Sequence, residues 1–204
     1  MRIAVLGASG RTGRLVVEQA VERGHQPRPV VRRPAAAVDE AWAVADGRDV
    51  AALTAALRDC DAVAFTIGPT GHSDSRVVTE CLAATLQAMA ASGVTRIAVV
   101  TADGPFADSG DPLSRFVAKP ILNRLLRESF ADFRAAEELL RASDVDWTVI
   151  RPSRLTDRPT RRYRARRNAS LWFGIKTSRA ATAAAVLDAL EDRSTVGAAI
   201  TVAN

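Results

Sequence analysis

The sequence predicts an α/β fold in which a Rossmann-like, doubly wound parallel sheet lies between two layers of helices. Short apolar runs alternate along the chain with longer segments of helical periodicity, an order that favours parallel strands joined by right-handed crossovers. The first apolar run leads directly into a glycine-rich turn. The length of 204 residues suits one domain, and neither a linker nor an internal repeat divides residues 1–204.

The elements of the first half follow from apolar runs and the residues that bound them. Residues 2–6 form an apolar run that ends in glycine, which is typical of a buried parallel strand. The following helix presents apolar side chains on one face and stops at Gly24. Pro27 and Pro29 remove ladder donors, so the second strand should start late or pair only in part. We expect strands at 2–6, 30–31, 42–45 and 62–67, and helices at 12–23 and 49–58, with Asp49 as a cap.

The second half continues the alternation. A long helix stops at Gly93, and the next apolar run predicts the fifth strand. Apolar residues recur at helical spacing between residues 113 and 143, which indicates one or two helices that pack in the core or against another subunit. Glu137 and Glu138 are expected on their solvated face. The expected helices are 75–92, 113–143 and 178–192, and the expected strands are 95–101, 147–151 and 199–202.

The composition indicates a globular protein rather than a membrane protein. Hydrophobic residues make up 48% and charged residues 25% of the chain, and no run reaches the roughly 18 apolar residues that cross a bilayer. The apolar run at the amino terminus is too short for a signal peptide, so we expect a cytoplasmic protein. Cys60 and Cys81 lack metal-ligand and thioredoxin spacing and should pack in the core; we expect no metal site.

The strongest chemical signal is the segment Gly7-Ala8-Ser9-Gly10-Arg11-Thr12-Gly13, between the first strand and the first helix. In a dinucleotide-binding turn, Gly7 permits the bend, Gly10 lets the backbone approach a pyrophosphate, and Gly13 lets the helix pack close to the strand. The helix N-terminus offers unpaired N–H groups and a partial positive charge to the phosphates. Ser9 and Thr12 add hydroxyl donors, and we expect these residues and Arg11 to form the cofactor site.

The residues at the end of the second strand bear on the choice of cofactor. NAD-specific sites place Asp or Glu there, about 20 residues beyond the glycines, to hold the ribose 2′-hydroxyl. This sequence has Arg32 and Arg33 instead. A guanidinium can hold a 2′-phosphate through two hydrogen bonds, so NADP(H) is favoured over NAD(H). The alternative is that one or both arginines are solvated surface charges.

These segments, together with Asp46-Gly47 and the run from Asp146 to Pro152, resemble the NAD(P)H-binding, NmrA-like branch of the atypical short-chain dehydrogenases. Within that branch the chain is similar, over nearly its whole length, to flavin reductases that also reduce biliverdin. The resemblance implies that Asp46, beside Gly47, meets the adenine end of the cofactor, although a turn or helix cap is the alternative role for Asp46. It further implies ribose and pyrophosphate contacts from Thr66, Ile67 and Gly68, a nicotinamide-ribose contact from Thr101, and a nicotinamide border formed by Pro152, Ser153 and Arg154.

The chain departs from ordinary short-chain dehydrogenases at the catalytic position. Those enzymes use a Tyr-x-x-x-Lys pair for proton transfer, whereas Tyr163, the only tyrosine here, is followed four residues later by Arg167. The serine that the flavin-reductase relatives carry after the fifth strand is replaced by Ala102. Asp103 and Ser153 are the candidates for a polar group at this end. Hydride transfer to a flat acceptor needs mainly ring stacking and exclusion of water, so it does not require the missing pair.

Three functions follow from these features. The first, which we expect, is an NADPH-dependent reductase that passes hydride to a flavin, a quinone or a similar conjugated acceptor. The second is a non-catalytic NADP(H)-binding redox sensor of the NmrA type. The third is a nucleotide-sugar epimerase or dehydratase, which is disfavoured because the chain lacks a separate substrate domain and a tyrosine base. The expected assembly is a monomer or a homodimer.

Eight arginines lie between residues 151 and 167, with Asp157 as the only acid among them. Because this segment follows the strand that should face the nicotinamide, we interpret it as a lid that attracts an anionic substrate such as FMN or a tetrapyrrole carboxylate. A solvated, mobile loop is the alternative. Nucleic acid is not expected as a partner because no reading motif accompanies the charge. Near the expected cleft, Arg154 and His72 are candidates for substrate contact.

Overall fold

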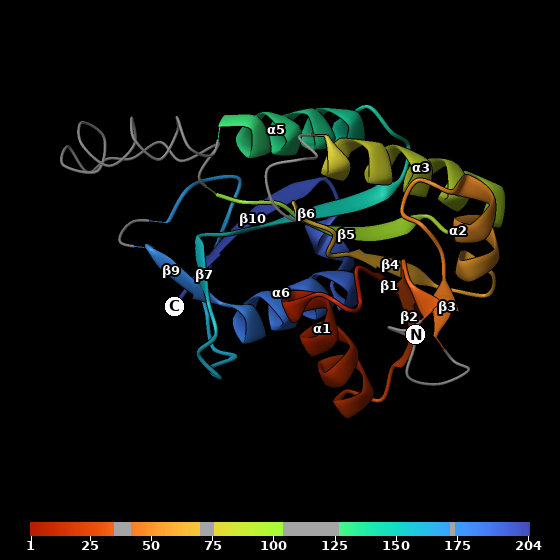
Figure 1. Ribbon diagram of the computed structural model, residues 1–204. Helices are drawn as coiled ribbons and strands as arrows, with labels where there is room; N and C mark the ends of the chain where they lie inside the picture. Colours follow the sequence, from red (N-terminus) through yellow and green to blue (C-terminus); the bar gives the residue numbers. More distant parts are fainter. Residues whose placement is uncertain (35–41, 70–75, 104–126, 172–173) are drawn as a thin grey trace.

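One sheet of eight strands runs through the middle of the described chain (Figure 1). The computed structural model describes residues 1–34, 42–69, 76–103, 127–171 and 174–204. The strands of this sheet are β1 (Arg2–Leu6), β2 (Gln26–Val31), β3 (Ala43–Val44), β4 (Ala62–Phe65), β5 (Arg96–Val100), β6 (Asp146–Pro152), β8 (Arg164–Arg167) and β10 (Ala198–Ala203).

The strand order is β3-β2-β1-β4-β5-β6-β10-β8, and every pairing is parallel except that of β10 with β8. The first six strands follow the order of a Rossmann fold, with the reversal of direction between β1 and β4. The predicted fold class is therefore confirmed. In such a sheet, ligands bind beyond the carboxyl ends of the parallel strands, near the reversal point.

Helices cover both faces of the sheet and complete the three layers seen in Figure 1. In the described chain they are α1 (Arg11–Glu22), α2 (Val50–Leu57), α3 (Val77–Ser92), α5 (Arg127–Arg141) and α6 (Arg179–Glu191). α1 packs against α6 on one face, and α3 packs between α2 and α5 on the other. The Asp49 carboxylate accepts the Ala52 N–H at 3.0 Å, which confirms the predicted cap of α2.

The core lies on both sides of the sheet because the parallel strands are buried on both faces. Along β1, Ala4 and Leu6 join the cluster beneath α2, α3 and α5. Ile3 and Val5 join the cluster beneath α1 and α6. Successive residues of β1 thus face opposite sides of the sheet, which is the period-two pattern of a strand. Because the residues on both sides are apolar, β1 is buried on both faces.

β2 starts earlier than predicted, because its prolines do not face β1. The Gln26 N–H donates to the Met1 carbonyl at 2.9 Å, and β2 pairs with β1 from Gln26 onward. Since alternate residues of a strand turn their backbone groups to opposite sides, Pro27 and Pro29 direct their nitrogens toward the side of β3. β3 pairs only with the last two residues of β2. No donor is therefore lost from the β1–β2 ladder.

The arginine-rich segment is strand at both ends, so the loop alternative applies only to residues 157–163, and its role as a lid stays a prediction. β7 (Arg154–Thr156) pairs in parallel with β9 (Lys176–Ser178) in a two-stranded ribbon, and β8 forms the antiparallel edge of the main sheet. All four residues of β8 are exposed. Charged side chains on an edge strand oppose pairing with another chain. Of the predicted helical region 113–143, residues 127–141 form α5, and residues 113–126 lie outside the described part.

Candidate cofactor-binding site

The turn after β1 depends on its glycines. Gly7 has a φ of +81°, a left-handed conformation that other residues rarely adopt. The Gly10 N–H donates to the Gly7 carbonyl at 2.9 Å. A Cβ on Gly13 would lie 2.2 Å from that carbonyl oxygen, so only glycine lets the start of α1 approach β1 this closely. A Cβ on Gly10 would meet the same oxygen at 3.1 Å and nothing else nearby, so the space beside Gly10 is open.

The first turn of α1 presents backbone N–H groups to this open space. The helix begins at Arg11 with Gly10 as its N-cap, and no side chain caps it. Its first N–H with a backbone acceptor belongs to Arg14, which donates to the Gly10 carbonyl at 3.0 Å. Within the described part of the chain, the N–H groups of Arg11, Thr12 and Gly13 have no acceptor. A diphosphate fits such donors, since they combine hydrogen bonding with the positive end of the helix.

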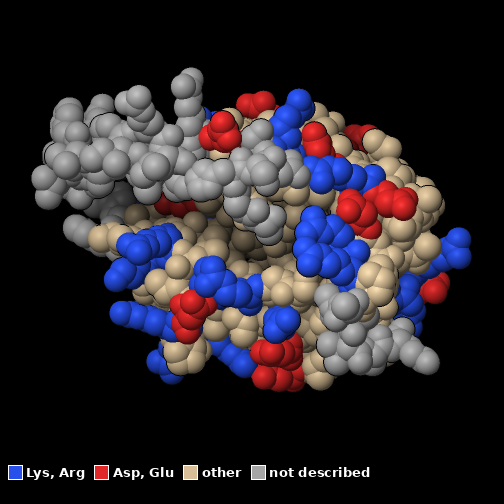
Figure 2. All heavy atoms as spheres, in the orientation of Figure 1, with Lys and Arg blue, Asp and Glu red and all other residues tan. Residues whose placement is uncertain are grey.

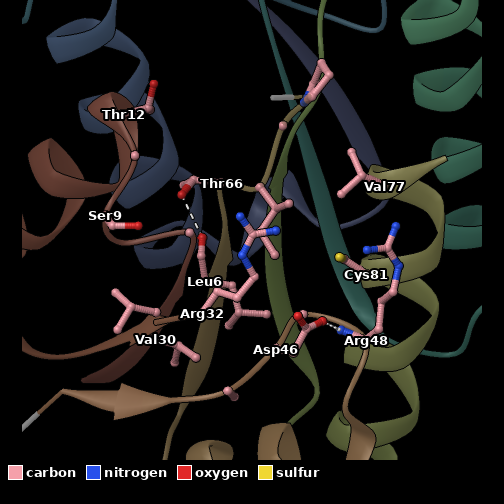
Figure 3. A pocket seen from close by; sticks show the side chains of 18 of the residues that line it. Leu6, Ser9, Thr12, Val30, Arg32, Asp46, Arg48, Thr66, Val77 and Cys81 are labelled. Carbon is pink, nitrogen blue, oxygen red and sulfur yellow. Dashed lines mark hydrogen bonds between the residues drawn. The ribbon is translucent and has the colours of Figure 1, made fainter. Parts of the chain in front are cut away.

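A pocket of about 390 Å³ opens where β1, β2 and β4 end (Figure 3). Eleven of the predicted cofactor residues line it: Gly7, Ser9, Gly10, Arg11, Thr12, Arg32, Asp46, Gly47, Thr66, Ile67 and Gly68. The predicted residues that do not line it are Gly13, Arg33, Thr101, Pro152 and Ser153. The pocket thus gathers the residues expected at the adenosine and diphosphate, and basic side chains gather around the hollowed centre of this face (Figure 2).

Arg32 extends into the pocket from the end of β2 (Figure 3). Its guanidinium has no hydrogen-bond or ion-pair partner among the residues that the structure describes. Arg33 is exposed and lies outside the pocket. Because an unpartnered guanidinium keeps its donors for a ligand, Arg32 fits a 2′-phosphate. Arg33 matches the alternative, a solvated surface charge.

The turn after β3 forms another wall of the pocket. Asp46 Oδ1 accepts the Arg48 N–H at 3.0 Å, so Asp46 shapes the turn as well as facing the cavity. A Cβ on Gly47 would lie 2.7 Å from Cys81 Sγ, and glycine is therefore needed for packing against α3. Arg48, which sequence reasoning missed, also lines the pocket while its Nε donates to Glu80 at 2.8 Å. Its only sequence signal was its position two residues after Asp46.

Thr66 connects the end of β4 to β1. Its Oγ1 donates to the Leu6 carbonyl at 2.7 Å, and its N–H donates to the same oxygen at 3.0 Å (Figure 3). The hydroxyl proton is thereby committed, so Thr66 can accept but not donate a hydrogen bond in the pocket. This contact holds Ile67 and Gly68, which follow the strand, in the pocket wall.

At the end of β5, Thr101 belongs to a buried ionic network. Thr101 Oγ1 and Arg151 Nε both donate to Glu137 Oε1 at 2.9 Å, and Arg151 and Arg141 donate to Oε2 at 2.5 and 2.6 Å. Glu137 is 1% exposed. The prediction of a solvated face was therefore wrong for Glu137, although Glu138 is exposed. The carboxylate tolerates burial because two guanidinium groups neutralise it.

Asp103 and Ser153, the two candidates for a polar catalytic group, lie at neighbouring strand ends. Asp103 is buried; its N–H donates to the Pro152 carbonyl at 3.0 Å, and its Oδ1 accepts from Thr201 Oγ1 at 3.3 Å. The Ser153 N–H donates to Thr177 Oγ1 at 3.0 Å. Ser153 Oγ is buried with no partner in the described chain. Of the two, Ser153 therefore has the hydroxyl that the described fold leaves without a hydrogen bond, although this oxygen is buried and Ser153 does not line the pocket.

Of the two predicted substrate contacts, the structure describes Arg154, which does not line the pocket. Arg154 begins β7 and is exposed. His72 lies outside the described residues, and so does its predicted contact with substrate. Cys60 and Cys81 are buried free thiols, as predicted, although Cys81 also contributes to the pocket wall. Across the described ranges, no group of three or more His, Cys, Asp or Glu residues could hold a metal ion.

Tyr163 lies in a charged cluster that ties the arginine-rich segment to α1 and α6. Its hydroxyl donates to Asp188, and Arg23 pairs with the other oxygen of that carboxylate at 2.7 Å. Burial and the Asp188 carboxylate raise the pKa of Tyr163 well above its usual range. Partial burial opposes the hydrogen bonds of His25 and Arg23 to Glu191, but these bonds prevail and lower the Glu191 pKa. Tyr163 is not a candidate proton carrier for the pocket, whose lining does not include it.

The strand order, the glycine turn and the pocket at the strand ends define a Rossmann-like, nucleotide-binding protein. The chain belongs to the NAD(P)H-binding family, which matches residues 7–193. This membership confirms the NAD(P)H-binding family that the glycine motif indicated, and the structural neighbours share the fold. No helix in the described part of the chain has the length and apolar character needed to span a membrane.

Three comparisons illustrate this relationship. The UPF0659 protein YMR090W of Saccharomyces cerevisiae is 29% identical over 168 residues, which cover 76% of this chain and 70% of the yeast protein. A Streptococcus pneumoniae protein named as an NADH-flavin reductase has a TM-score of 0.84 at 22% identity, covering 100% of this chain and 99% of its own. A Veillonella parvula short-chain dehydrogenase/reductase in complex with NADP has a TM-score of 0.78 at 19% identity, covering 100% and 94%. The last two comparisons concern the fold.

Proposed function

We propose that this chain is an NADPH-dependent reductase that passes hydride to a flavin, a quinone or a similar conjugated acceptor. The observation that carries the proposal is that the N-terminus of α1 and Arg32, whose guanidinium has no partner among the described residues, open onto the same cavity. Family membership gives NAD(P)H binding, and Arg32 favours the phosphorylated form. The NADP complex of the Veillonella protein and the name of the Streptococcus protein support the cofactor and the acceptor class.

The preference for NADPH is tested by Arg32→Ala, with Arg33→Ala as the matched control. Hydrogen bonds to a charged group contribute about 1.5 to 3 kcal/mol, so Arg32→Ala should raise the Kd for NADPH about 10- to 150-fold. The Kd for NADH, which lacks the 2′-phosphate, should change little. Arg33→Ala removes the same charge one residue away and should leave both values nearly unchanged. Titration calorimetry measures the four constants, and an NADPH preference that survives Arg32→Ala contradicts the assignment.

The acceptor class follows from the groups that the site can offer for proton transfer. Tyr163 is bonded to Asp188 outside the pocket, and the Thr101 hydroxyl donates to Glu137. When bound, the reduced nicotinamide supplies a hydride, and a conjugated acceptor can take its further proton from water. During the hydride step itself, the protein needs only to align two rings and exclude water; the acceptor takes up its proton afterwards, when it meets solvent. Ser153, whose buried hydroxyl has no partner in the ranges that the structure describes, is the candidate for a polar contact at this end, and Arg154 for contact with an anionic substrate.

NADPH oxidation measured at steady state with FMN, FAD and a quinone tests the reductase proposal, with a simple ketone as the comparison substrate. We expect turnover with at least one conjugated acceptor and none with the ketone. Turnover of the ketone alone would contradict the proposal, because it would require a proton donor that the described site does not offer.

A non-catalytic NADP(H) sensor is the second candidate. One observation favours it: the side chains of Thr101 and Asp103, expected near the reacting ring, are buried in contacts within the fold. A sensor would bind NADPH tightly in the calorimeter while its turnover stayed near zero with every acceptor. The two measurements together therefore separate the candidates.

A further inference from the structure

Asp157, the single acid of the arginine-rich segment, bridges two arginines of the pocket. Its Oδ1 accepts from the Arg179 guanidinium at 2.5 Å, and its Oδ2 accepts from the Arg11 guanidinium at 3.3 Å. Both arginines line the pocket. Asp157 follows β7, so this bridge connects the arginine-rich segment to the cavity beside the glycine turn.

Arg179 occupies a position that disfavours a cation. It is the first residue of α6, where the helix dipole is positive, and its side chain is only 11% exposed. The Ser178 hydroxyl already caps this helix by accepting the Ala181 N–H at 3.0 Å, so Arg179 has no capping role. A largely buried guanidinium at a helix N-terminus needs an anion beside it, and among the described residues Asp157 supplies that charge.

The two helices whose first residues are these arginines pack against each other. β10 is parallel to β6, so the helix that precedes it, α6, must run in the opposite direction to the strands. α6 therefore begins at the carboxyl ends of the parallel strands, where β1 also ends and α1 begins. Gln19 Nε2 in α1 donates to the Ala180 carbonyl of α6 at 3.0 Å. Two guanidinium groups, each on the first residue of a helix, thus hold one carboxylate, and the same groups suit a phosphate anion.

We propose that Asp157 is a built-in competitor of the cofactor diphosphate for Arg11, and that Arg179 is a further diphosphate-binding residue. The inference deepens the proposed function and rests on it. The Arg11 bond is the one that yields, because it is the longer of the two and its partners are 71% and 67% exposed. Arg179 is closer to Asp157 than Arg11 is, and its side chain is more buried. It contributes its charge to the diphosphate whether or not Arg11 is bonded to Asp157.

The inference predicts that removing the Asp157 charge tightens cofactor binding. Asp157→Asn should lower the Kd about three- to tenfold, because a carboxylate close to the bound diphosphate repels it. NADPH and NADH should gain equally, since both carry the diphosphate, in contrast to the selective effect expected for Arg32→Ala. Arg179→Gln should raise the Kd for both cofactors.

Calorimetric titration of the full chain with NADPH and with NADH tests this, at about 50 mM and about 500 mM salt. The gain from Asp157→Asn should shrink at the higher salt because exposed charges are screened. Asp157→Glu, which keeps the charge, should behave like the unmodified chain. Asp59→Asn is the matched control: its carboxylate is exposed, lies 3.9 Å from Arg2 and stands at the opposite edge of the sheet.

A Kd for Asp157→Asn that equals or exceeds that of the unmodified chain at low salt would overturn the proposal, as would an equal gain for Asp59→Asn. Circular dichroism confirms that each variant is folded. If the unmodified chain binds neither dinucleotide, the proposed function fails and this inference with it. If the unmodified chain binds and Asp157→Asn does not bind more tightly, only this inference fails.

Discussion

Gly13→Ala separates the packing of the glycine turn from its role in binding. The new methyl would lie 2.2 Å from the Gly7 carbonyl oxygen and 2.9 Å from Ala8 Cα. Since a Cβ contact below 3.0 Å is not tolerated, the start of α1 must move away from β1 by at least about 0.8 Å. The obstacle is backbone and cannot rotate away. Overpacking of this kind costs about 2 to 3 kcal/mol, which lowers the Tm of a chain of this size by about 4 to 12 °C.

The displacement should also reduce cofactor binding, because the N–H groups of the first turn of α1 move with the helix. A shift near 1 Å can weaken a positioned interaction about 100-fold. Gly10→Ala is the matched control, since its methyl would meet only one atom, at 3.1 Å, and its φ of −73° suits alanine. Gly10→Ala should weaken NADPH binding while leaving the Tm nearly unchanged. Thermal melting and calorimetry measure both quantities; an unchanged Tm for Gly13→Ala would refute the steric argument.

Three further predictions concern the charged groups outside the pocket. Glu137→Gln removes the buried carboxylate that pairs with the Arg151 and Arg141 guanidinium groups, and it should lower the free energy of unfolding by about 3 to 5 kcal/mol in a urea titration; a change below about 1 kcal/mol would show that solvent already screens the network. Tyr163→Phe should leave kcat for NADPH oxidation within about twofold, since the raised pKa of Tyr163 and its bond to Asp188 exclude it from proton transfer, and a tenfold loss would contradict this. The pKa of Glu191 is lowered in the folded chain, so its ion pairs stabilise the fold above the unfolded pKa of 4.5, and this stabilisation is lost as the pH falls through the folded pKa. Glu191→Gln should therefore lower the free energy of unfolding slightly at neutral pH, by under about 1 kcal/mol for so exposed a pair, and the difference should vanish in acid. A difference that grew in acid would show that the pKa of Glu191 is raised instead.

The glycine turn and Arg32 could be predicted because their information is local. Seven consecutive residues determine a bend, a close helix start and a set of free N–H groups, and the residues that end β2 necessarily lie beside that turn in a parallel sheet. The same reasoning failed where several elements meet. The prolines of β2 were expected to delay the strand or to limit its pairing; the strand is not delayed, because it pairs with β1 from Gln26, and only its pairing with β3 is partial.

Glu137 shows why the nicotinamide end resisted prediction. Its neighbour Glu138 and its place in a helix with charged residues suggested solvent exposure, yet the helix turns it inward against Arg151 and Thr101. These partners come from other secondary-structure elements, so the residues next to Glu137 in the sequence do not predict them. A buried carboxylate is tolerated only where cations meet it, and that meeting is a property of the packed chain.

Hydrophobic periodicity and glycine sterics act over a few residues, so the order of amino acids was enough to predict the class of fold, the glycine turn and the charge at the end of β2. Which charges meet depends instead on how the whole chain packs. The tertiary packing brings Asp157 into ion pairs with Arg179 and with Arg11, which is 146 residues away in the sequence. It also directs Thr101 into a buried network. Electrostatic partners are chosen by distance in space, and the packing of α1, α5 and α6 on the sheet sets those distances.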